Sequence, residues 1–495
     1  MLFNSGVFLV VFLPIVVIGY YLINKINNRS AIPYDLIWLF LMSLIFYGYE
    51  KPIFVLLIVL SIVWNYLCTR MMNRFINHKK FFLVLGLLFN FGLLFYFKYF
   101  NFFMENVYAL TDKYWAWKNI FLPLGISFFT FQQVSFLVDY YRDSTAMEYS
   151  FWEYAAFVSF FPQLVAGPIV LHQELIPQFR DSVKKRINYD NLCLGMYAFS
   201  LGLAKKVLLA DTLSKVVAIG MRDFLENNTG TGLVVMAAYT LQIYFDFSGY
   251  CDMAIGIAKL FNFSLPVNFN SPYKAGTVRE FWKRWHLTLT RFFTIYVYIP
   301  LGGSRKGKLR TYGNTFFIFL LSGLWHGANW TFICWGMLHG LLMTVEKMVA
   351  DLTKNRHIFG QKIWKGIYRV WVLVFINVSW MIFRSDSLVI FRIFMQRLAN
   401  GSWNVISQIP DPINKKIEFR MLARLGLGRI TEVFPSFLLV AFLICCWIGV
   451  LCMKNTQEKM ESFTGNWKTS LVTIVLLVWS IFSFSDVGEF LYFNF

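Results

Sequence analysis

Two histidines forty residues apart carry the strongest chemical signal in this chain. His326 lies within the motif LWHGANW, deep in an apolar run. Polar residues in such runs are costly to bury and are usually functional. An imidazole titrates near neutral pH and can accept the proton of a hydroxyl group, so His326 is a candidate general base. The alternative is a histidine that bonds a neighbouring carbonyl and only packs helices together.

The second histidine, His286, ends the cluster REFWKRWH. If this cluster is helical, Trp282 and His286 are neighbours at i, i+4 and the cations point elsewhere. A cationic face beside an aromatic one suits a polyanionic, adenine-bearing molecule such as coenzyme A, because guanidinium groups bind phosphate and stack on rings. Arg279, Trp282, Lys283 and Arg284 are therefore candidate donor-binding residues. The alternative is a juxtamembrane helix whose cations meet anionic lipid headgroups.

Other polar residues lie in the same apolar surroundings. Asp246, Ser248 and Asp252 lie in the run 233–260, where carboxylates are expected to face a cavity or to pair with a cation. The two carboxylates are six residues apart and point in different helical directions, so they are poorly placed as a catalytic pair. We assign these three residues, together with Asn329, to a structural or tunnel-lining role.

A third histidine, His339, follows His326 by thirteen residues. Along a straight helix this spacing is about 20 Å. The two histidines therefore cannot act on one reacting atom unless the helix between them breaks.

The elements that position these residues are membrane helices. The chain is 57% hydrophobic and 15% charged, and charged residues make up about 25% of ordinary soluble domains. A span needs about 20 mostly apolar residues. The candidates are 7–23, 34–49, 53–68, 81–97, 120–138, 154–171, 192–210, 233–260, 314–343, 366–383, 434–453 and 469–485. We predict an all-α polytopic membrane protein with eleven to thirteen transmembrane or re-entrant helices around a central tunnel.

We predict one domain over residues 1–495. N-terminal helices occupy 1–260, a core segment with both motif histidines occupies 261–345, and C-terminal helices occupy 346–495. Residues 262–312 interrupt the hydrophobic rhythm yet are too aromatic for a disordered linker. They suggest short or re-entrant helices, which survive at membrane depth only within protein or beside a water-filled cavity.

Three further segments interrupt the apolar pattern. Residues 401–430 form a second, polar connection. The segment FPQLVAGPI at 161–169 predicts a broken helix, because proline removes a helical hydrogen bond. The run 314–343 is long enough for one tilted helix or for a broken pair.

The charge balance is strongly basic, since 46 Lys and Arg against 27 Asp and Glu give +19. The cations lie mainly between apolar runs, which is typical of the positive-inside rule and not of a nucleic-acid partner. Residues 69–80, with two Arg and two Lys, and residues 347–365 are predicted to be cytoplasmic. The seven cysteines form no CxxC pair or Cys/His ligand set, so no metal site is predicted.

These clusters together resemble the membrane-bound O-acyltransferase family, in its bacterial alginate O-acetyltransferase branch. The matching motifs are MLFNS, FPQLVAGPI, QIYFDFSGYCDMAI, FWKRWH, YIPLGG, LWHGANW and the terminal FLYFNF. They extend from the first residue to the last, and their order and spacing make a chance match very rare.

The resemblance implies that His326 is the catalytic residue and that His286 is the second family position. It implies acyl transfer from a cytoplasmic thioester, acetyl-coenzyme A, with no tightly bound cofactor, in the inner membrane of a bacterium. The expected acceptor is an exported or cell-wall polysaccharide, and the expected partners are membrane lipid and an extracytoplasmic esterase-like protein. A secondary transporter is the main alternative, since it too would use broken helices and buried charges. A non-catalytic scaffold of a polysaccharide export machine is another.

Overall fold

The structure of the protein is a computed structural model. It describes residues 1–26, 32–111, 117–143, 148–353, 362–406, 408–414, 416, 436–484 and 491. Every regular element within these ranges is helical, and they contain no strand. The predicted all-α class is confirmed.

Six helical segments are long and apolar enough to cross a membrane. They are Phe8–Ile26 (η1 Phe8–Phe12 and α1 Leu13–Ile26), α3 (Ile53–Arg74), Ile76–Thr111 (η2 Ile76–His78, α4 Lys79–Leu94, η3 Phe95–Tyr99 and α5 Phe100–Thr111), Tyr189–Arg222 (α10 Tyr189–Ala204, η4 Lys205–Ala210 and α11 Asp211–Arg222), α16 (Trp330–Leu352) and Trp364–Arg384 in α17 (Lys362–Arg384). Three shorter apolar helices are α2 (Tyr34–Gly48), α22 (Phe437–Cys452) and α24 (Trp467–Phe482). The polytopic membrane architecture is thus confirmed.

The other helices are shorter or more polar. They are α6 (Ile126–Arg142), α7 (Phe151–Ser159), α8 (Phe161–Leu164), α9 (His172–Arg180), α12 (Thr229–Leu260), η5 (Pro272–Lys274), α13 (Val278–Trp282), α14 (Leu287–Phe293), η6 (Thr294–Tyr298), α15 (Lys308–His326), α18 (Leu388–Leu398), α19 (Asp411–Asn414) and α23 (Thr456–Glu461). The prediction of eleven to thirteen helices included such buried and re-entrant segments.

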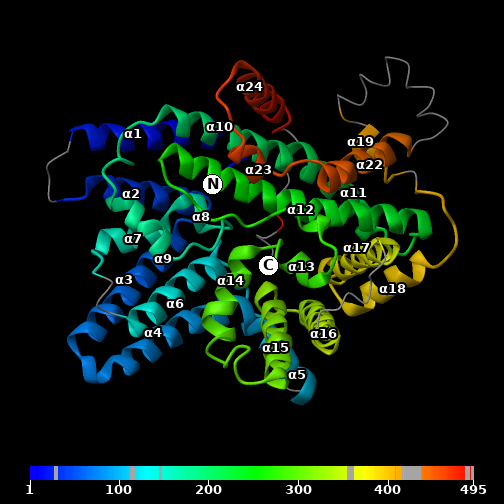
Figure 1. Cartoon of the computed structure of the whole chain (residues 1–495), viewed down its shortest axis with the longest axis horizontal. Helices are drawn as coiled ribbons and strands as arrows, with labels where there is room; N and C mark the ends of the chain where they lie inside the picture. The colour runs from blue at the N-terminus through cyan, green and yellow to red at the C-terminus, as the bar shows by residue number, and fades with distance from the viewer. Residues whose placement is uncertain are drawn as a thin grey trace.

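The buried helix α12 crosses the middle of the molecule, and α10 lies beside it (Figure 1). The two helices approach backbone to backbone at paired glycines. A Cβ on Gly202 would lie 2.6 Å from the carbonyl oxygen of Gly249, and one on Gly195 would lie 2.7 Å from that of Gly256. Small residues permit this approach where no hydrophobic driving force holds helices together in lipid. The contact fixes the rotation of α12 about its axis and so the directions in which Asp246 and Asp252 point.

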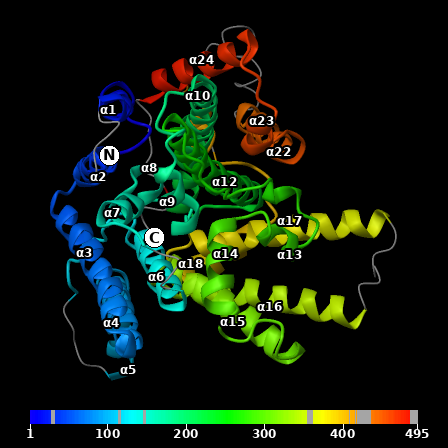
Figure 2. The same ribbon diagram turned by 60° about the vertical axis from the view of Figure 1, so that its left-hand side comes forward.

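The run 314–343 is a broken pair and not one tilted helix. α15 ends at His326, residues 327–329 connect, and α16 begins at Trp330. The side chain of Asn329 accepts a hydrogen bond from the amide of Thr331 and caps α16. A Cβ on Gly323 would lie 2.4 Å from the carbonyl oxygen of Phe332, so the two helices pack without side chains between them. α15, α16 and α17 form one group of helices in Figure 2.

The connection 262–312 forms the short helices that its composition predicts. η5, α13, α14 and η6 follow one another with tight turns between them. The segment FPQLVAGPI is also broken as predicted, because α7 ends at Ser159 and the four-residue α8 begins next to Pro162. Most of the other predicted connection, 401–430, lies outside the described residues.

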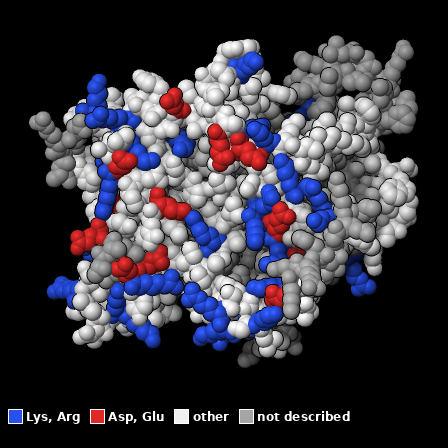
Figure 3. Space-filling model, viewed as in Figure 1, with Lys and Arg blue, Asp and Glu red and all other residues white. Residues whose placement is uncertain are grey.

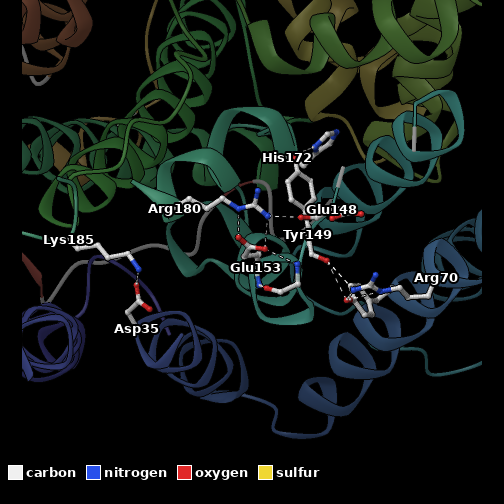
Figure 4. A network of polar contacts seen from close by, with 10 residues as sticks. Asp35, Arg70, Glu148, Tyr149, Glu153, His172, Arg180 and Lys185 are labelled. Carbon is white, nitrogen blue, oxygen red and sulfur yellow. Dashed lines mark hydrogen bonds and ion pairs between the residues drawn. The ribbon is translucent and has the colours of Figure 1, made fainter. Parts of the chain in front are cut away.

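Ion pairs tie the early helices to the segment around α9 (Figure 4). Arg180 of α9 binds Glu153 of α7, and Lys185 binds Asp35 of α2 with a nitrogen–oxygen distance of 2.7 Å. The hydroxyl of Tyr149 lies 3.2 Å from Nδ1 of His172. On the face drawn in Figure 3, Lys and Arg side chains are interspersed with acidic ones. The described residues form no continuous basic surface on this face.

Candidate active site

The structure brings the two motif histidines to one buried place. His326 ends α15, and His286 precedes α14; their exposed fractions are 2% and 0%. The ring of Trp325 neighbours both, with its centre 4.9 Å from that of the His326 ring and 6.1 Å from that of the His286 ring. His286 is also close enough to act electrostatically on His326. Residues forty positions apart therefore share one environment.

The hydrogen bonds of Asn268 determine which nitrogen of His286 carries a proton. Its Oδ1 accepts from the backbone amide of Thr288 at 3.2 Å and from the Thr288 hydroxyl at 2.9 Å, so this atom is an acceptor. Nδ1 of His286, 3.0 Å from the same oxygen, must donate to it. Nε2 is then the unprotonated nitrogen, and it has no hydrogen-bond partner among the described residues. A buried acceptor of this kind is available to a substrate hydroxyl.

Backbone conformation explains why His286 is turned toward the core. Its φ is +47°, in the left-handed region that non-glycine residues rarely adopt. α13 ends at Trp282, four residues earlier, so the conditional prediction that Trp282 and His286 are helical neighbours is wrong. Trp282 packs on His339 and His286 packs on Phe247. The strained turn separates Trp282 from His286, so that the two side chains pack on different neighbours.

His339 is a connector between helices. Its Nδ1 accepts the indole N–H of Trp282 at 3.2 Å, and its Nε2 donates to the hydroxyl of Ser379 at 3.1 Å. Both ring nitrogens are thus used in joining α13, α16 and α17. The break after His326 also folds the chain back, so that Trp335 contacts both histidines, at 5.2 Å and 4.9 Å between ring centres. The straight-helix separation of 20 Å therefore does not apply.

A cavity of about 270 Å³ adjoins the cluster predicted to bind the donor. Arg279, Trp282 and Lys283 line it, together with Lys347 of α16, which the sequence patterns did not single out. Ser322 also lines it, one helical turn before His326 on α15. Glu346, beside Lys347, accepts the amides of Val278 and Arg279 at 2.9 Å and so holds the start of α13 in place.

Arg284 is placed differently from the other cations of the cluster. Its guanidinium binds Glu280 at 2.8 Å and the carbonyl oxygen of Asn270, and it does not line the cavity. Burial raises the pKa of Glu280, but the amide of Gly276 and the Arg284 guanidinium lower it by more, so the net pKa lies below its ordinary value. Glu280 is therefore a carboxylate, and it holds the Arg284 guanidinium in an ion pair outside the cavity.

The polar residues of α12 are paired with cations from η4. Asp246 binds Lys206 at 2.7 Å and also accepts the backbone amide of Leu491 at 2.7 Å. Asp252 binds Lys205 at 2.6 Å and the hydroxyl of Thr456 at 2.6 Å. As predicted from their spacing, the two carboxylates point in different directions and pair with cations. Asp246 thereby ties the end of the chain to the core.

The remaining two tunnel-lining candidates are also placed by the structure. Ser248 and Asp252 line a small cavity of about 10 Å³, which is room for about one water. Asn329 caps α16 and donates to the carbonyl oxygen of Asp386, which assigns it a structural role. A tunnel through the protein stays a prediction.

Two further features of the site, besides Lys347, were not among the predicted residues. Lys98, which lies far from the two lysines that begin the long apolar segment Ile76–Thr111, donates to the carbonyl oxygen of Trp325. Asn268 orients His286 from the irregular connection. A cation in an apolar run is a recognisable signal, whereas nothing in the pattern around Asn268 distinguishes it from other loop asparagines.

Comparison with known proteins agrees with this arrangement. The model of the membrane-bound O-acyltransferase family matches residues 89–384, which include both motif histidines and Lys98. The peptidoglycan O-acetyltransferase of Helicobacter pylori is 36% identical over 100% of this chain and 98% of its own length. A Pseudomonas putida protein named "Probable alginate O-acetylase AlgI" is 33% identical over the whole of both chains. The teichoic acid D-alanyltransferase of Bacillus subtilis is 26% identical over 51% of this chain and 66% of its own.

Similarity over the full length and a family match across both histidines favour an enzyme over the transporter and scaffold alternatives. The buried imidazole pair, with a cation-lined cavity that reaches α15 one helical turn before His326, is consistent with transfer of an activated acyl group. The chain is an O-acyltransferase and belongs to the membrane-bound O-acyltransferase family.

Proposed function

We propose that this enzyme takes an acetyl group from a cytoplasmic thioester, acetyl-coenzyme A, for the O-acetylation of an exported or cell-wall polysaccharide. The observation that carries the proposal is the convergence of His286 and His326 on one aromatic ring, that of Trp325. The cation-lined cavity reaches α15 at Ser322, one helical turn before His326. The names of the full-length relatives, which refer to peptidoglycan and alginate, support an acetyl group and a glycan acceptor.

In the proposed reaction, His326 takes the proton of the accepting hydroxyl while the hydroxyl oxygen attacks the thioester carbonyl carbon. The unprotonated Nε2 of His286 accepts a hydrogen bond and orients the hydroxyl or the donor. The tetrahedral intermediate then expels the thiolate, which recovers the proton from His326. This sequence needs no tightly bound cofactor.

The donor is proposed to enter at the cation-lined cavity. Three cations complement the phosphates of coenzyme A, because charge-assisted contacts to phosphate are the stronger class of hydrogen bond. Trp282 offers an aromatic face there for an adenine ring. Ser322 lines this cavity one helical turn before His326 on α15. A donor bound in the cavity would therefore have its acyl end near the general base.

We further propose that the protein lies in the inner, cytoplasmic membrane of a bacterium, with residues 69–80 on the cytoplasmic side. The four cations of that loop support this orientation. The donor then reaches the protein from inside while the polysaccharide lies outside. An extracytoplasmic, esterase-like partner is proposed to complete the transfer.

Steady-state kinetics with purified enzyme test this function. Release of free thiol from acetyl-coenzyme A is measured in the presence of a soluble glycan fragment. The triple variant Arg279→Gln, Lys283→Gln, Lys347→Gln is expected to raise the KM for acetyl-coenzyme A and to affect kcat less, because these contacts exist before and during transfer. Loss of one charged contact, about 1.5–3 kcal/mol, corresponds to a roughly 10–150-fold rise in KM.

Arg284→Gln is the matched control, since Arg284 belongs to the same cluster but binds Glu280 outside the cavity. Its KM is expected to stay at the wild-type value. An unchanged KM in the triple variant would show that these cations do not bind the donor. No thiol release by folded wild-type protein would contradict the proposed function as a whole.

A further inference from the structure

Lys98 is a buried cation that the reaction as described leaves unused. It lies in η3, a π-helical stretch within the long apolar segment Ile76–Thr111. Such stretches occur frequently at functional sites. Its ammonium donates to the carbonyl oxygen of Trp325 at 2.5 Å and lies 3.4 Å from the hydroxyl of Ser127. The next residue, Tyr99, donates its hydroxyl to the carbonyl oxygen of Leu324 at 2.9 Å.

Within the part of the chain that the structure describes, Lys98 has no acidic partner. No carboxylate of the described residues forms an ion pair with it, and its hydrogen-bond acceptors are neutral. By contrast, Lys205 and Lys206 each bind an aspartate of α12. An uncompensated charge at membrane depth is costly and usually marks a functional site. Capping of the last carbonyls of α15 would not by itself require a charge, because the neutral hydroxyl of Tyr99 already does the same one residue earlier.

Lys98 lies beside the same aromatic ring as the two histidines. Its Nζ is 5.6 Å from the centre of the Trp325 ring, which the His326 and His286 rings approach to 4.9 Å and 6.1 Å. The Lys98 ammonium is also close enough to His326 to act electrostatically on that ring. Lys98 is therefore placed to supply a positive charge beside the two histidines.

We propose that Lys98 stabilises the oxyanion of the acyl-transfer intermediate; this inference rests on the proposed function. As the acceptor oxygen forms its bond to the carbonyl carbon and His326 takes the proton, the π electrons of the carbonyl move to its oxygen. The ammonium of Lys98 balances that charge. When the carbonyl re-forms, the carbon–sulfur bond breaks and the thiolate leaves with the proton from His326. A fixed donor of this kind acts mainly on the transition state.

Lys98→Gln separates the charge from the helix-capping hydrogen bond, because glutamine retains an N–H donor for the Trp325 carbonyl but carries no charge. We expect a fall in kcat of about 10²–10³-fold with little change in the KM for acetyl-coenzyme A. Lys98→Arg, which keeps the charge, should retain much more of kcat. Tyr99→Phe is the matched control: it removes the neighbouring capping bond and should leave kcat within a few-fold of wild type.

Size-exclusion chromatography and thermal unfolding of each purified variant report on folding. The proposal would be overturned if kcat fell equally in Lys98→Gln and Tyr99→Phe, or if a folded Lys98→Gln enzyme kept the wild-type kcat. If Lys98→Gln does not fold, the kcat of Lys98→Arg relative to wild type tests the proposal. A folded arginine variant that retains kcat supports a role of charge, and a folded, inactive one counts against it. Activity of His326→Ala would instead refute the proposed function, independently of Lys98.

Discussion

Alanine substitution of His326 and of His339 should give opposite results, although both histidines contact Trp335. His339 binds Trp282 and Ser379 through its two ring nitrogens. In His339→Ala, the indole N–H of Trp282 loses its acceptor in the core, which costs about 1–3 kcal/mol. The hydroxyl of Ser379 still donates to the carbonyl oxygen of Ile376, so the serine is less affected. We therefore expect a loss of stability with clear residual activity in the folded fraction.

His326→Ala should leave the protein folded and reduce acyl transfer by about 10²–10⁴-fold, the usual contribution of a general base. Both variants are purified in detergent, their thermal unfolding is recorded, and thiol release is measured per folded molecule. His339→Asn is a useful control, because its Oδ1 lies close to the position of Nδ1 and can accept the indole N–H of Trp282. This variant should recover part of the stability that His339→Ala loses.

Two outcomes would refute the reasoning. A folded His326→Ala protein that still transferred acetyl groups would exclude this residue as the base. A stable but inactive His339→Ala protein would mean that His339 belongs to the catalytic site, which its complete set of hydrogen bonds argues against.

Three further predictions follow from the contacts. Asn268→Leu removes the acceptor of the His286 Nδ1–H, and a cost of about 1–3 kcal/mol in the transition state would lower kcat by roughly 5–150-fold. Asn268→Asp keeps an acceptor oxygen and should retain more activity. Equal kcat values for wild type, Asn268→Leu and Asn268→Asp would contradict the assigned tautomer. Lys205→Met leaves the partly buried Asp252 without its cation and should cost about 1–3 kcal/mol in denaturant unfolding, while adding Asp252→Asn should restore stability. A double variant no more stable than the single one would show that the pair does not act as described. A cysteine at His78, in a background without native cysteines, should resist an impermeant thiol reagent in intact cells, and ready labelling would reverse the orientation.

Much of the architecture could be predicted from composition and local pattern. Membrane helices must satisfy their own backbone hydrogen bonds and present apolar side chains, so each span leaves a clear signal. The break near Pro162 and the irregular stretch after residue 261 were also predictable, since proline and glycine act on the local backbone. His326, His286 and the cations around Arg279 were recognisable because polar residues are rare in such surroundings.

The relations between distant segments were decided only by the tertiary structure. Whether His326 and His339 are far apart depends on a helix break at residues 327–329, and the motif at 314–343 allowed either outcome. Arg284 and Lys283 are adjacent cations of one short cluster, but Arg284 forms an ion pair with Glu280 whereas Lys283 lines the cavity. The contact of Lys98 with Trp325 joins positions 227 residues apart. A sequence specifies the local cost of burying each charge, but the partner that offsets this cost comes from another part of the chain, and only packing determines which one it is.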